Sequence, residues 1–240
     1  MVEVRELSKR FGDVLAVDGV SFACRPGEIF GLLGENGAGK TTTLRIIATL
    51  LTPTSGTAVV NGFSVTTEPA EVRRSIGLIS ADSGLYDRLT PRETVRYFGR
   101  LYDMDDRTIR RRSEEIFELL DMKDYADRRT GQFSKGMKQK VSIARTLVHD
   151  PPVLLLDEPT AGLDVSAVKM IDDFILRAKE RGKTIIFSSH IMGEVEKLCD
   201  RVAIVSRGRV VAAGTITELK QNDVRARFED VFLRLVGDRS

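Results

Sequence analysis

One loop constrains the fold of this chain more than any other feature. The segment GENGAGKTT, residues 34–42, follows the apolar run IFGLL and precedes TTTLRIIATLL, in which Leu44, Ile47, Ala48 and Leu51 are spaced to share one helical face. In the order strand, glycine-rich loop and helix, backbone N–H groups can turn inward around a phosphate. The segment therefore predicts a phosphate-binding P-loop in an α/β fold.

The residue types in this loop indicate a nucleoside triphosphate as the ligand. Glycine lets the backbone approach the α and β phosphates, Lys40 can neutralise the β and γ oxygens, and Thr41 offers a hydroxyl to Mg²⁺. The residues expected to bind ATP are Gly34, Glu35, Asn36, Gly37, Ala38, Gly39, Lys40, Thr41 and Thr42.

A second strand end carries two adjacent carboxylates, Asp157 and Glu158, after the apolar run VLLL. Successive side chains at the end of a strand point apart, so the two can have different roles. Asp157 is expected to hold Mg²⁺ through water. Glu158 is expected to polarise the attacking water, an effect of about 10² to 10⁴ in rate for general-base catalysis.

One of the two histidines also follows a strand-like run. His190 ends TIIFSSH, and ligands collect at the carboxyl ends of parallel strands. That position, with Ser188 and Ser189 beside it, predicts that His190 senses the γ-phosphate. His149, which precedes Asp150 and a proline, is interpreted as an ordinary residue at the end of a helix.

Hydrophobic patterning divides the chain into a β-rich beginning, a helical middle and an alternating end. Residues from Thr90 to about Asp150 follow a helical pattern, with Pro91 in a first turn. Later apolar runs alternate with helices over 165–181 and 192–198, which predicts a parallel sheet covered on both faces.

We therefore expect one domain over residues 1–240, of the α/β class. It would have a RecA-like P-loop NTPase core with a parallel sheet, and an N-terminal antiparallel β lobe. A helical subdomain would be inserted at about 85–150, where Ile109, Ile116, Phe117 and Leu120 share one face, and a charged tail would occupy 219–240.

The stretch FSKGMKQKVSIARTL, residues 133–147, predicts a second helix whose start suits an anion. Ser134 is placed to cap it and Gly136 lets a ligand approach the backbone. Lys135, Lys138 and Lys140 are expected around the opening turn. A chain that binds one nucleotide at its P-loop thus has two helix starts suited to phosphate.

Composition excludes several classes of protein. The apolar runs are far shorter than the roughly 20 residues that cross a bilayer, and no signal peptide is recognised, so we expect a cytosolic protein. Cys24 and Cys199 lack metal-ligand spacing and are expected as reduced core thiols. With 37 basic and 35 acidic side chains the net charge is +2, so no nucleic-acid partner is expected.

Together these segments resemble the ATP-binding subunit of ABC transporters over nearly the whole chain. GENGAGKT is similar to the Walker A loop of that family, LLLDE to its Walker B strand, SSH to its switch histidine and FSKGM to its LSGGQ signature. AGLD, which ends at Asp164, resembles the D-loop. Phe11 is similar to the aromatic residue that stacks on adenine, and packing on a strand face is the alternative for it.

The resemblance implies a Mg²⁺-dependent ATPase that works as a pair. In the family two subunits associate head to tail, and each ATP lies between the Walker A loop of one and the signature helix of the other. Ser134, Lys135, Gly136 and Met137 are thus expected to meet ATP bound to a second subunit, with a homodimer expected. ATP would close the pair and hydrolysis would release it, driving an integral membrane permease at the cytoplasmic face of the cell membrane.

The segments GLYDRLTPRE and FEDVFLRLVG resemble the exporter branch with separate membrane subunits, and particularly its sodium-extrusion subunits. The resemblance therefore implies export, of sodium or a drug. The region from Tyr86 to Arg96 is expected either to meet the permease or to be a solvated face.

Two segments depart from the family pattern. Lys135 and Met137 replace the first glycine and the glutamine of LSGGQ, and the lysine adds charge near phosphate. The Q-loop glutamine should fall near Ala81, where none is present. Asp82 or Ser80 is the hypothetical substitute that touches Mg²⁺ or the attacking water.

Two other classes of protein are alternatives to a transporter subunit. A soluble ABC-type ATPase of iron–sulfur assembly or nucleic-acid maintenance is the first; coiled coils, a second cassette and Cys-rich clusters are absent, but the iron–sulfur form needs none of them. A P-loop kinase or GTPase is the second, and it would lack the Asp157-Glu158 pair together with FSKGM.

Overall fold

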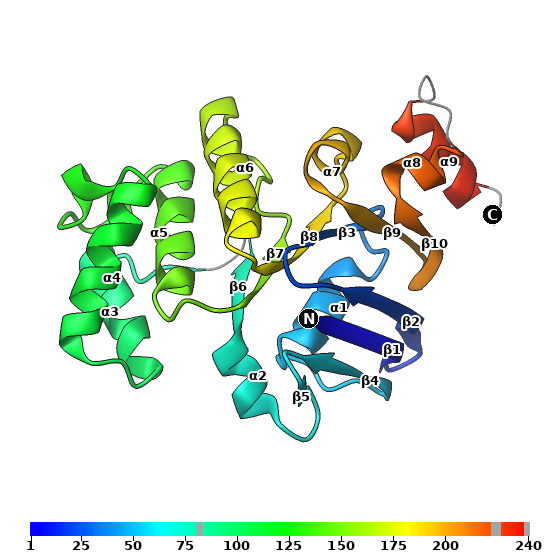
Figure 1. Cartoon of the computed structure of the whole chain (residues 1–240), viewed down its shortest axis with the longest axis horizontal. Coiled ribbons are helices and arrows are strands. Elements are labelled where there is room, and N and C mark those ends of the chain that lie inside the picture. Colours follow the sequence, from blue (N-terminus) through cyan, green and yellow to red (C-terminus); the bar gives the residue numbers. More distant parts are fainter. Residues whose placement is uncertain (81–83, 222–226, 238–240) are drawn as a thin grey trace.

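The computed structural model describes residues 1–80, 84–221 and 227–237, and its strands form two sheets (Figure 1). An antiparallel sheet has the strand order β2-β1-β4-β5, and a larger sheet has the order β10-β9-β3-β8-β7-β6. The strands are β1 (Val2–Phe11), β2 (Val14–Cys24), β3 (Ile29–Leu33), β4 (Ser55–Val60), β5 (Phe63–Ser64), β6 (Ile76–Ser80), β7 (Val153–Asp157), β8 (Thr184–Ser189), β9 (Arg201–Ser206) and β10 (Arg209–Thr215).

The larger sheet is parallel from β9 to β6, as predicted, and β10 adds an antiparallel edge strand. In β3, Ile29 and Leu33 belong to one core cluster, whereas Phe30 and Leu32 belong to the other. Both faces of this sheet are therefore buried, which explains why its strands read as continuous apolar runs.

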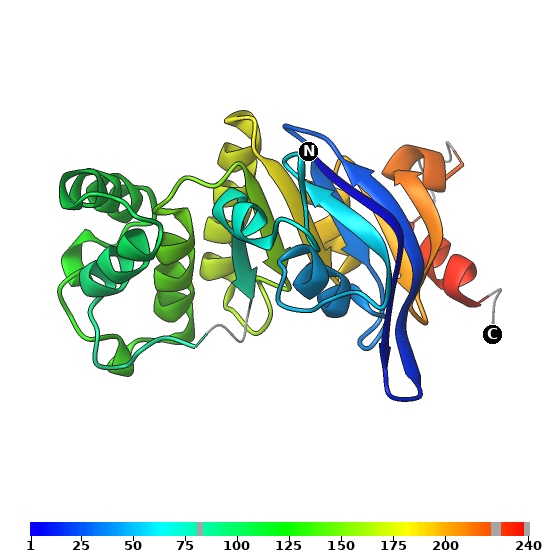
Figure 2. The same ribbon diagram turned by 90° about the horizontal axis from the view of Figure 1, so that it is seen from below.

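Helices cover both faces of the larger sheet. In the described residues they are α1 (Lys40–Ile47), α2 (Pro69–Ser75), α3 (Pro91–Leu101), α4 (Asp106–Leu119), α5 (Lys135–Leu147), α6 (Val165–Glu180), α7 (Met192–Leu198), α8 (Ile216–Leu219) and α9 (Phe228–Gly237). The core around α1 also includes β1, β2 and β4, so the antiparallel sheet closes over α1 (Figure 2). Helices α5, α6, α7 and α9 contribute to the core on the opposite face.

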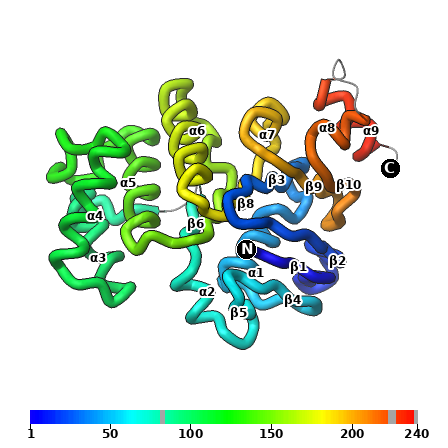
Figure 3. Tube along the Cα trace, in the orientation of Figure 1, coloured from blue at the N-terminus to red at the C-terminus, as the bar shows by residue number. Residues whose placement is uncertain are grey.

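The predicted helical subdomain is present as α3, α4 and α5, which gather at one end of the molecule (Figure 3). Thr90 caps α3 and exchanges hydrogen bonds with Glu93 in a capping box, with Pro91 in the first turn as expected. The predicted shared face of α4 is confirmed, because Ile109, Ile116 and Phe117 are all buried.

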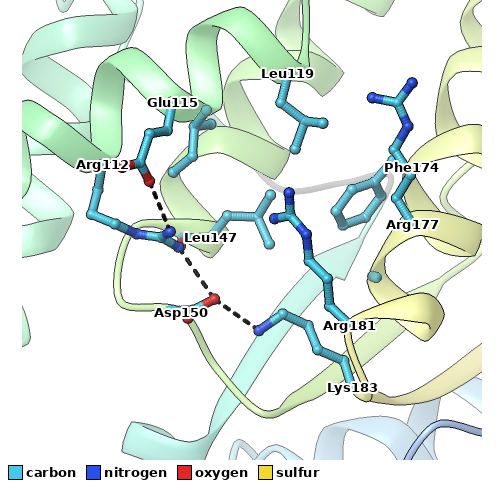
Figure 4. A pocket seen from close by; sticks show the side chains of 11 residues that line it. Arg112, Glu115, Leu119, Leu147, Asp150, Phe174, Arg177, Arg181 and Lys183 are labelled. Atoms are coloured by element: carbon cyan, nitrogen blue, oxygen red, sulfur yellow. Dashed lines mark hydrogen bonds and ion pairs between the residues drawn. The ribbon is translucent and has the colours of Figure 1, made fainter.

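Ion pairs join this subdomain to the segments that precede strands β7 and β8 of the larger sheet. Arg112 of α4 lies 3.2 Å from Asp150 Oδ1, and Lys183, just before β8, lies 2.9 Å from the same atom. The three side chains line a cavity of about 180 Å³, together with Arg177 of α6 and Arg181, which follows that helix (Figure 4). This cavity shares no residue with the P-loop.

His149, expected to be an ordinary helix-end residue, also joins the helical subdomain to the larger sheet. Its ring stacks on Tyr102 at 3.6 Å between centroids, and its Nε2 lies 3.0 Å from the Ile76 carbonyl oxygen of β6. Burial lowers the pKa of His149 to about 4. The imidazole is therefore neutral at pH 7 and serves packing.

Helix α1 ends at Ile47, so the prediction that Leu51 lies on its apolar face is wrong; Thr49 has a left-handed φ of 60° that turns the chain out of the helix. The charged tail packs through α9, where Phe228, Val231 and Phe232 are buried.

Cys24 and Cys199 are free thiols, as expected, and burial raises the pKa of Cys24 to about 12. Among the described residues, no helix combines the length and the apolar character that crossing a membrane requires.

Candidate nucleotide site

The loop between β3 and α1 turns where glycine permits it. Gly37 has φ 80° and Gly39 has φ 104°, both in the left-handed region. A Cβ on Gly39 would lie 2.5 Å from the carbonyl oxygen of Ala16 on β2. The Gly208 N–H donates to the Ala38 carbonyl at 3.0 Å. The backbones of two distant segments therefore support the loop from outside.

Lys40 places a buried positive charge at the start of α1. The residue is 4% exposed, and its Nζ donates to the carbonyl oxygens of Gly34 at 2.7 Å and Glu35 at 3.0 Å. A buried ammonium needs acceptors or an anion around it. The ammonium thus lies within the curve of the loop, where it can neutralise phosphate oxygens.

Thr41 and Asp157 meet across the gap between α1 and β7. The Thr41 hydroxyl donates to Asp157 Oδ1 at 3.0 Å, and the Ser188 hydroxyl donates to the same oxygen at 2.7 Å. Asp157 is 7% exposed, so these donors compensate for the burial of its carboxylate. A hydroxyl and a carboxylate, from the P-loop helix and from a neighbouring strand end, thus converge.

Glu158 turns away from Asp157 and has different partners. Its φ of 47° is left-handed, which is uncommon for a residue with a Cβ, and its N–H is held by the carbonyl oxygen of Ser188 at 3.2 Å and the Ser188 hydroxyl at 3.1 Å. Its carboxylate lies 3.4 Å from Lys40 Nζ and 3.3 Å from His190 Nδ1. The carboxylate is therefore beside the phosphate-binding lysine and can orient a water there.

Phe11 lies at the turn end of the β1–β2 hairpin. Its side chain is 45% exposed, and Lys9 Nζ lies 5.1 Å from the ring centroid. The alternative that Phe11 packs in the core is therefore wrong. An exposed ring can serve as a stacking surface for a base.

The second helix start is built as the sequence predicts. Ser134 caps α5, and its Oγ accepts from the Met137 N–H at 3.2 Å. Asp164 caps α6, where the Ser166 hydroxyl and the Ala167 N–H lower the pKa of its carboxyl. Within the described part of the chain, no hydrogen bond or ion pair joins residues 133–137 to residues 34–42. Figures 1 and 2 place α5 and α1 on different sides of β6 and β7.

The lysines near this start have separate partners. Lys135 Nζ donates to the Ala161 carbonyl at 2.7 Å, Lys138 Nζ lies 3.3 Å from Asp87, and Lys140 Nζ donates to the Asp121 carbonyl at 3.2 Å. The expectation that all three surround the opening turn is wrong for Lys140, which lies in the second turn and is held by the helical subdomain. Lys138 lies in the first turn and pairs with Asp87 there.

The segment expected to contain the Q-loop begins at the end of β6. Ser80 is the register partner of Asp157 in the parallel pair β6–β7, so its backbone lies beside the site. Ala81 and Asp82 lie outside the described residues.

Several supports of the site were not predicted from the sequence. Ser188 was noted only as a neighbour of His190, yet its hydroxyl joins Asp157 to the Glu158 backbone. Its register partner is Asp157, so the signal lies in strand pairing and not in a local motif. The contact of Ala16 with Gly39 likewise depends on how the two sheets pack.

The residues around Thr41 and Asp157 fit Mg²⁺. This ion prefers oxygen ligands and is usually held by one or two protein groups, with water and substrate phosphates completing the shell. A hydroxyl and a carboxylate oxygen 3.0 Å apart meet that description. Among the described residues, no group of three or more His, Cys, Asp or Glu side chains is placed to hold a metal ion.

Comparison with known proteins decides the family. The family model described as ABC transporter matches residues 17–161. The chain belongs to the ABC transporter family. It is 47% identical to the ABC transporter ATP-binding protein NatA of Bacillus subtilis, over 96% of this chain and 95% of that protein. It is 36% identical to the linearmycin resistance ATP-binding protein LnrL of the same organism, over 91% of this chain and 70% of that protein.

A solved structure extends this family assignment to a nucleotide-bound state. The dimeric ATP-binding cassette MJ0796, in a post-hydrolysis state with ADP and phosphate, has a TM-score of 0.80 and 26% identity, and the match covers 90% of this chain and 98% of that one. The chain is thus an ATP-binding, ATP-hydrolysing ABC subunit with the predicted α/β P-loop fold. The comparisons give no support to the soluble ABC alternative.

Proposed function

We propose that this ABC ATPase binds each ATP between two subunits, in a head-to-tail pair of identical copies. One observation carries the proposal: the P-loop and the start of α5 both suit phosphate, yet no hydrogen bond or ion pair links them within the described residues. A partner's α5 can supply the second set of donors. Residues 1–240 would act as one ATP-binding domain, with the helical subdomain at about 85–150 and the tail at 219–240.

Each subunit would hold most of its own nucleotide. Phe11 would stack on adenine, the loop from Gly34 to Thr42 would bind the phosphates, and Thr41 and Asp157 would hold Mg²⁺. Bound Mg²⁺ would neutralise charge on the β and γ oxygens. The proximity of Glu158 to Lys40 and His190 supports a general base at Glu158 and a γ-phosphate sensor at His190.

The partner subunit would complete the site from its own helix α5. Its Ser134 hydroxyl and Gly136 N–H would donate to the γ-phosphate, and the dipole of the helix favours the same negative charge. Lys135, Met137 and Asp164 would lie beside that contact. ADP lacks the γ-phosphate, so ATP favours the closed pair and hydrolysis favours the open one.

A groove beside the helical subdomain is the proposed docking place of the permease. It has a volume of about 280 Å³ between the end of α1, β6, α3 and α5, and its lining includes Leu50, Phe98, Tyr102 and Arg145. Leu50 is 59% exposed. Tyr97 and Leu101 of α3 and Tyr86 before it are also exposed, and the Tyr97 ring contacts the rings of both Tyr86 and Phe98. This supports the predicted Tyr86–Arg96 region as part of a larger contact.

Helix α5 links the two proposed surfaces. Ser134 caps its beginning, and Arg145 and Thr146 near its end line the groove. A helix of 13 residues is about 20 Å long. A rotation of the helical subdomain that brings Ser134 to the partner's ATP would therefore also move the docking groove.

The cellular role follows from these parts. With a permease bound, the subunit would lie at the cytoplasmic face of the cell membrane. We propose export as the direction, because the relative LnrL is named for resistance to linearmycin. A drug or sodium is the proposed cargo class.

The test replaces Glu158 with glutamine. Glu158→Gln keeps the side-chain size and removes the base, so ATP affinity should be retained and turnover should fall by about two orders of magnitude or more. ATP should then trap a dimer that light scattering detects, and ADP should not.

Asp150→Asn is a matched control. It makes the same carboxylate-to-amide change, but in the cavity between Arg112 and Lys183, away from the P-loop. It should leave turnover near the wild-type value. Turnover that survives in Glu158→Gln would exclude Glu158 as the base, and an ATP-bound variant that stays monomeric would exclude the shared site.

A further inference from the structure

The first two turns of α5 are fastened to the loop that follows Glu158. Lys135 Nζ donates to the Ala161 carbonyl oxygen at 2.7 Å. One turn later Gln139 Nε2 donates to the Pro159 carbonyl oxygen at 3.1 Å, and Gln139 is 7% exposed. Residues four apart on a helix lie on the same face, so one face of α5 makes both bonds to the loop.

The loop is shaped to admit the lysine. Gly162 has φ 66°, and a Cβ placed on it would lie 2.5 Å from Lys135 Nζ. Beside it the start of α5 packs on α6, because a Cβ on Gly136 would meet the Cβ of Ala167 at 3.4 Å. The ammonium therefore occupies a space that a larger residue at 162 would fill.

This loop connects two groups of the proposed site. It is built from two successive turns, in which the Ala161 N–H donates to the Glu158 carbonyl at 3.1 Å and the Leu163 N–H donates to the Thr160 carbonyl at 3.2 Å. Asp164 follows directly and caps α6. A shift of the Ala161 carbonyl would thus be felt at Glu158 on one side and at Asp164 on the other.

We propose that Lys135 is a positioning residue that holds the start of α5 and the loop 159–164 of one subunit as a single body. The proposal rests on the shared site, because that body is what a subunit would present to its neighbour's ATP. Groups that are ordered before association lose less entropy when the γ-phosphate binds. The glycine of the LSGGQ pattern has no side chain for this tie, so the tie is a consequence of the departure at Lys135.

The experiment compares Lys135→Met, which keeps the length but removes the donor, with Lys135→Arg, which restores a charged donor. Lys140→Met is the matched control, because Lys140 lies on the same helix and also donates to a carbonyl, that of Asp121 in the helical subdomain. The first measurement is amide hydrogen exchange of residues 160–164 in the monomer without nucleotide, since Pro159 has no amide hydrogen. The second is the ATP-driven dimer dissociation constant, measured with each change in the Glu158→Gln background.

Lys135→Met should accelerate exchange of the loop amides and raise the dimer dissociation constant, each by about tenfold, the usual worth of one charge-assisted hydrogen bond. Affinity for ADP should stay within about twofold, since ADP needs only the P-loop side. Lys135→Arg and Lys140→Met should resemble the parent protein in both measurements.

The outcomes separate the two proposals. Unchanged loop exchange in Lys135→Met overturns the tie, whatever the dimer does. Faster exchange with an unchanged dissociation constant overturns the claim that the tie prepares the loop for the neighbour's ATP. A parent Glu158→Gln protein that never dimerises with ATP refutes the shared site itself, and the role of Lys135 in dimerisation is refuted with it.

Discussion

At the residue scale, the site is an arrangement of charges that compensate one another in the free subunit. Lys40 is held by two carbonyl oxygens of its own loop and lies near Glu158. Phosphate oxygens can replace those acceptors, because they carry full charge and give shorter, stronger hydrogen bonds to an ammonium. Glu158 would then be released from Lys40 toward water and His190.

Lys40→Ala tests this directly. Loss of one charge-assisted contact should weaken ATP binding by about 10- to 100-fold, measured by titration calorimetry. Lys197→Ala is a suitable control, because Lys197 pairs with Asp172 between α6 and α7, away from the loop. Tight, unchanged ATP affinity in Lys40→Ala would refute the role proposed for this lysine.

The sequence predicts those site residues that belong to a local motif, and it does not predict those that are placed by strand pairing or helix packing. Lys40, Thr41, Asp157 and Glu158 were predicted because each belongs to a local order of strand, loop and helix. Ser188 was not predicted to donate a hydrogen bond to Asp157, because that contact depends on the register of β7 against β8. The partner of Lys135 depends on the packing of α5 on α6, which no local spacing reports.

At the element scale, α5 and its surroundings join the proposed nucleotide contact to the proposed docking groove. The face of α4 and the place of Pro91 in the first turn of α3 were predicted, since periodicity and a proline at a helix start are local signals. The end of α1 was not, because ATLLTP has no glycine at the point where Thr49 turns left-handed. The division into an antiparallel lobe and a parallel sheet was predicted, but the order of the strands within each sheet was not, since strand pairing joins residues far apart in sequence.

His149 gives the seam between α3, α5 and β6 a dependence on pH. Burial lowers its pKa from 6.5 to about 4, with Lys183 and Arg112 acting in the same direction and Asp150 and the Ile76 carbonyl opposing them. The unfolded chain therefore binds the proton at a higher pH than the folded chain does. The contribution of His149 to the free energy of unfolding is fully present above the unfolded-state pKa. It falls as the pH drops toward 4, by up to about 3 kcal/mol.

The prediction is tested with urea unfolding between pH 7 and 4.5. His149→Phe keeps a ring for stacking on Tyr102 but removes the titrating group, so its free energy of unfolding should fall less steeply with acid than that of the parent. The two slopes should differ most between pH 6.5 and 4.5. Equal slopes would show that His149 is not the group responsible.

At the scale of the whole molecule, the proposed shared site makes each subunit a scaffold that carries only part of the reaction centre. The two faces of the larger sheet are buried by separate cores, and the P-loop and the helical subdomain are both attached to this sheet. In the proposed pair, ATP would act as a switch between two such molecules, because only the triphosphate would reach donors on both. A net charge of +2 leaves association to these specific contacts.

The most direct test of the shared site is ATP turnover per subunit, measured over a wide range of protein concentrations. Turnover per subunit should be constant at high concentration and fall on dilution once the pairs separate. Ser134→Ala should lower the plateau. Turnover that stays constant to the lowest measurable concentration, and is the same in Ser134→Ala, would contradict the account.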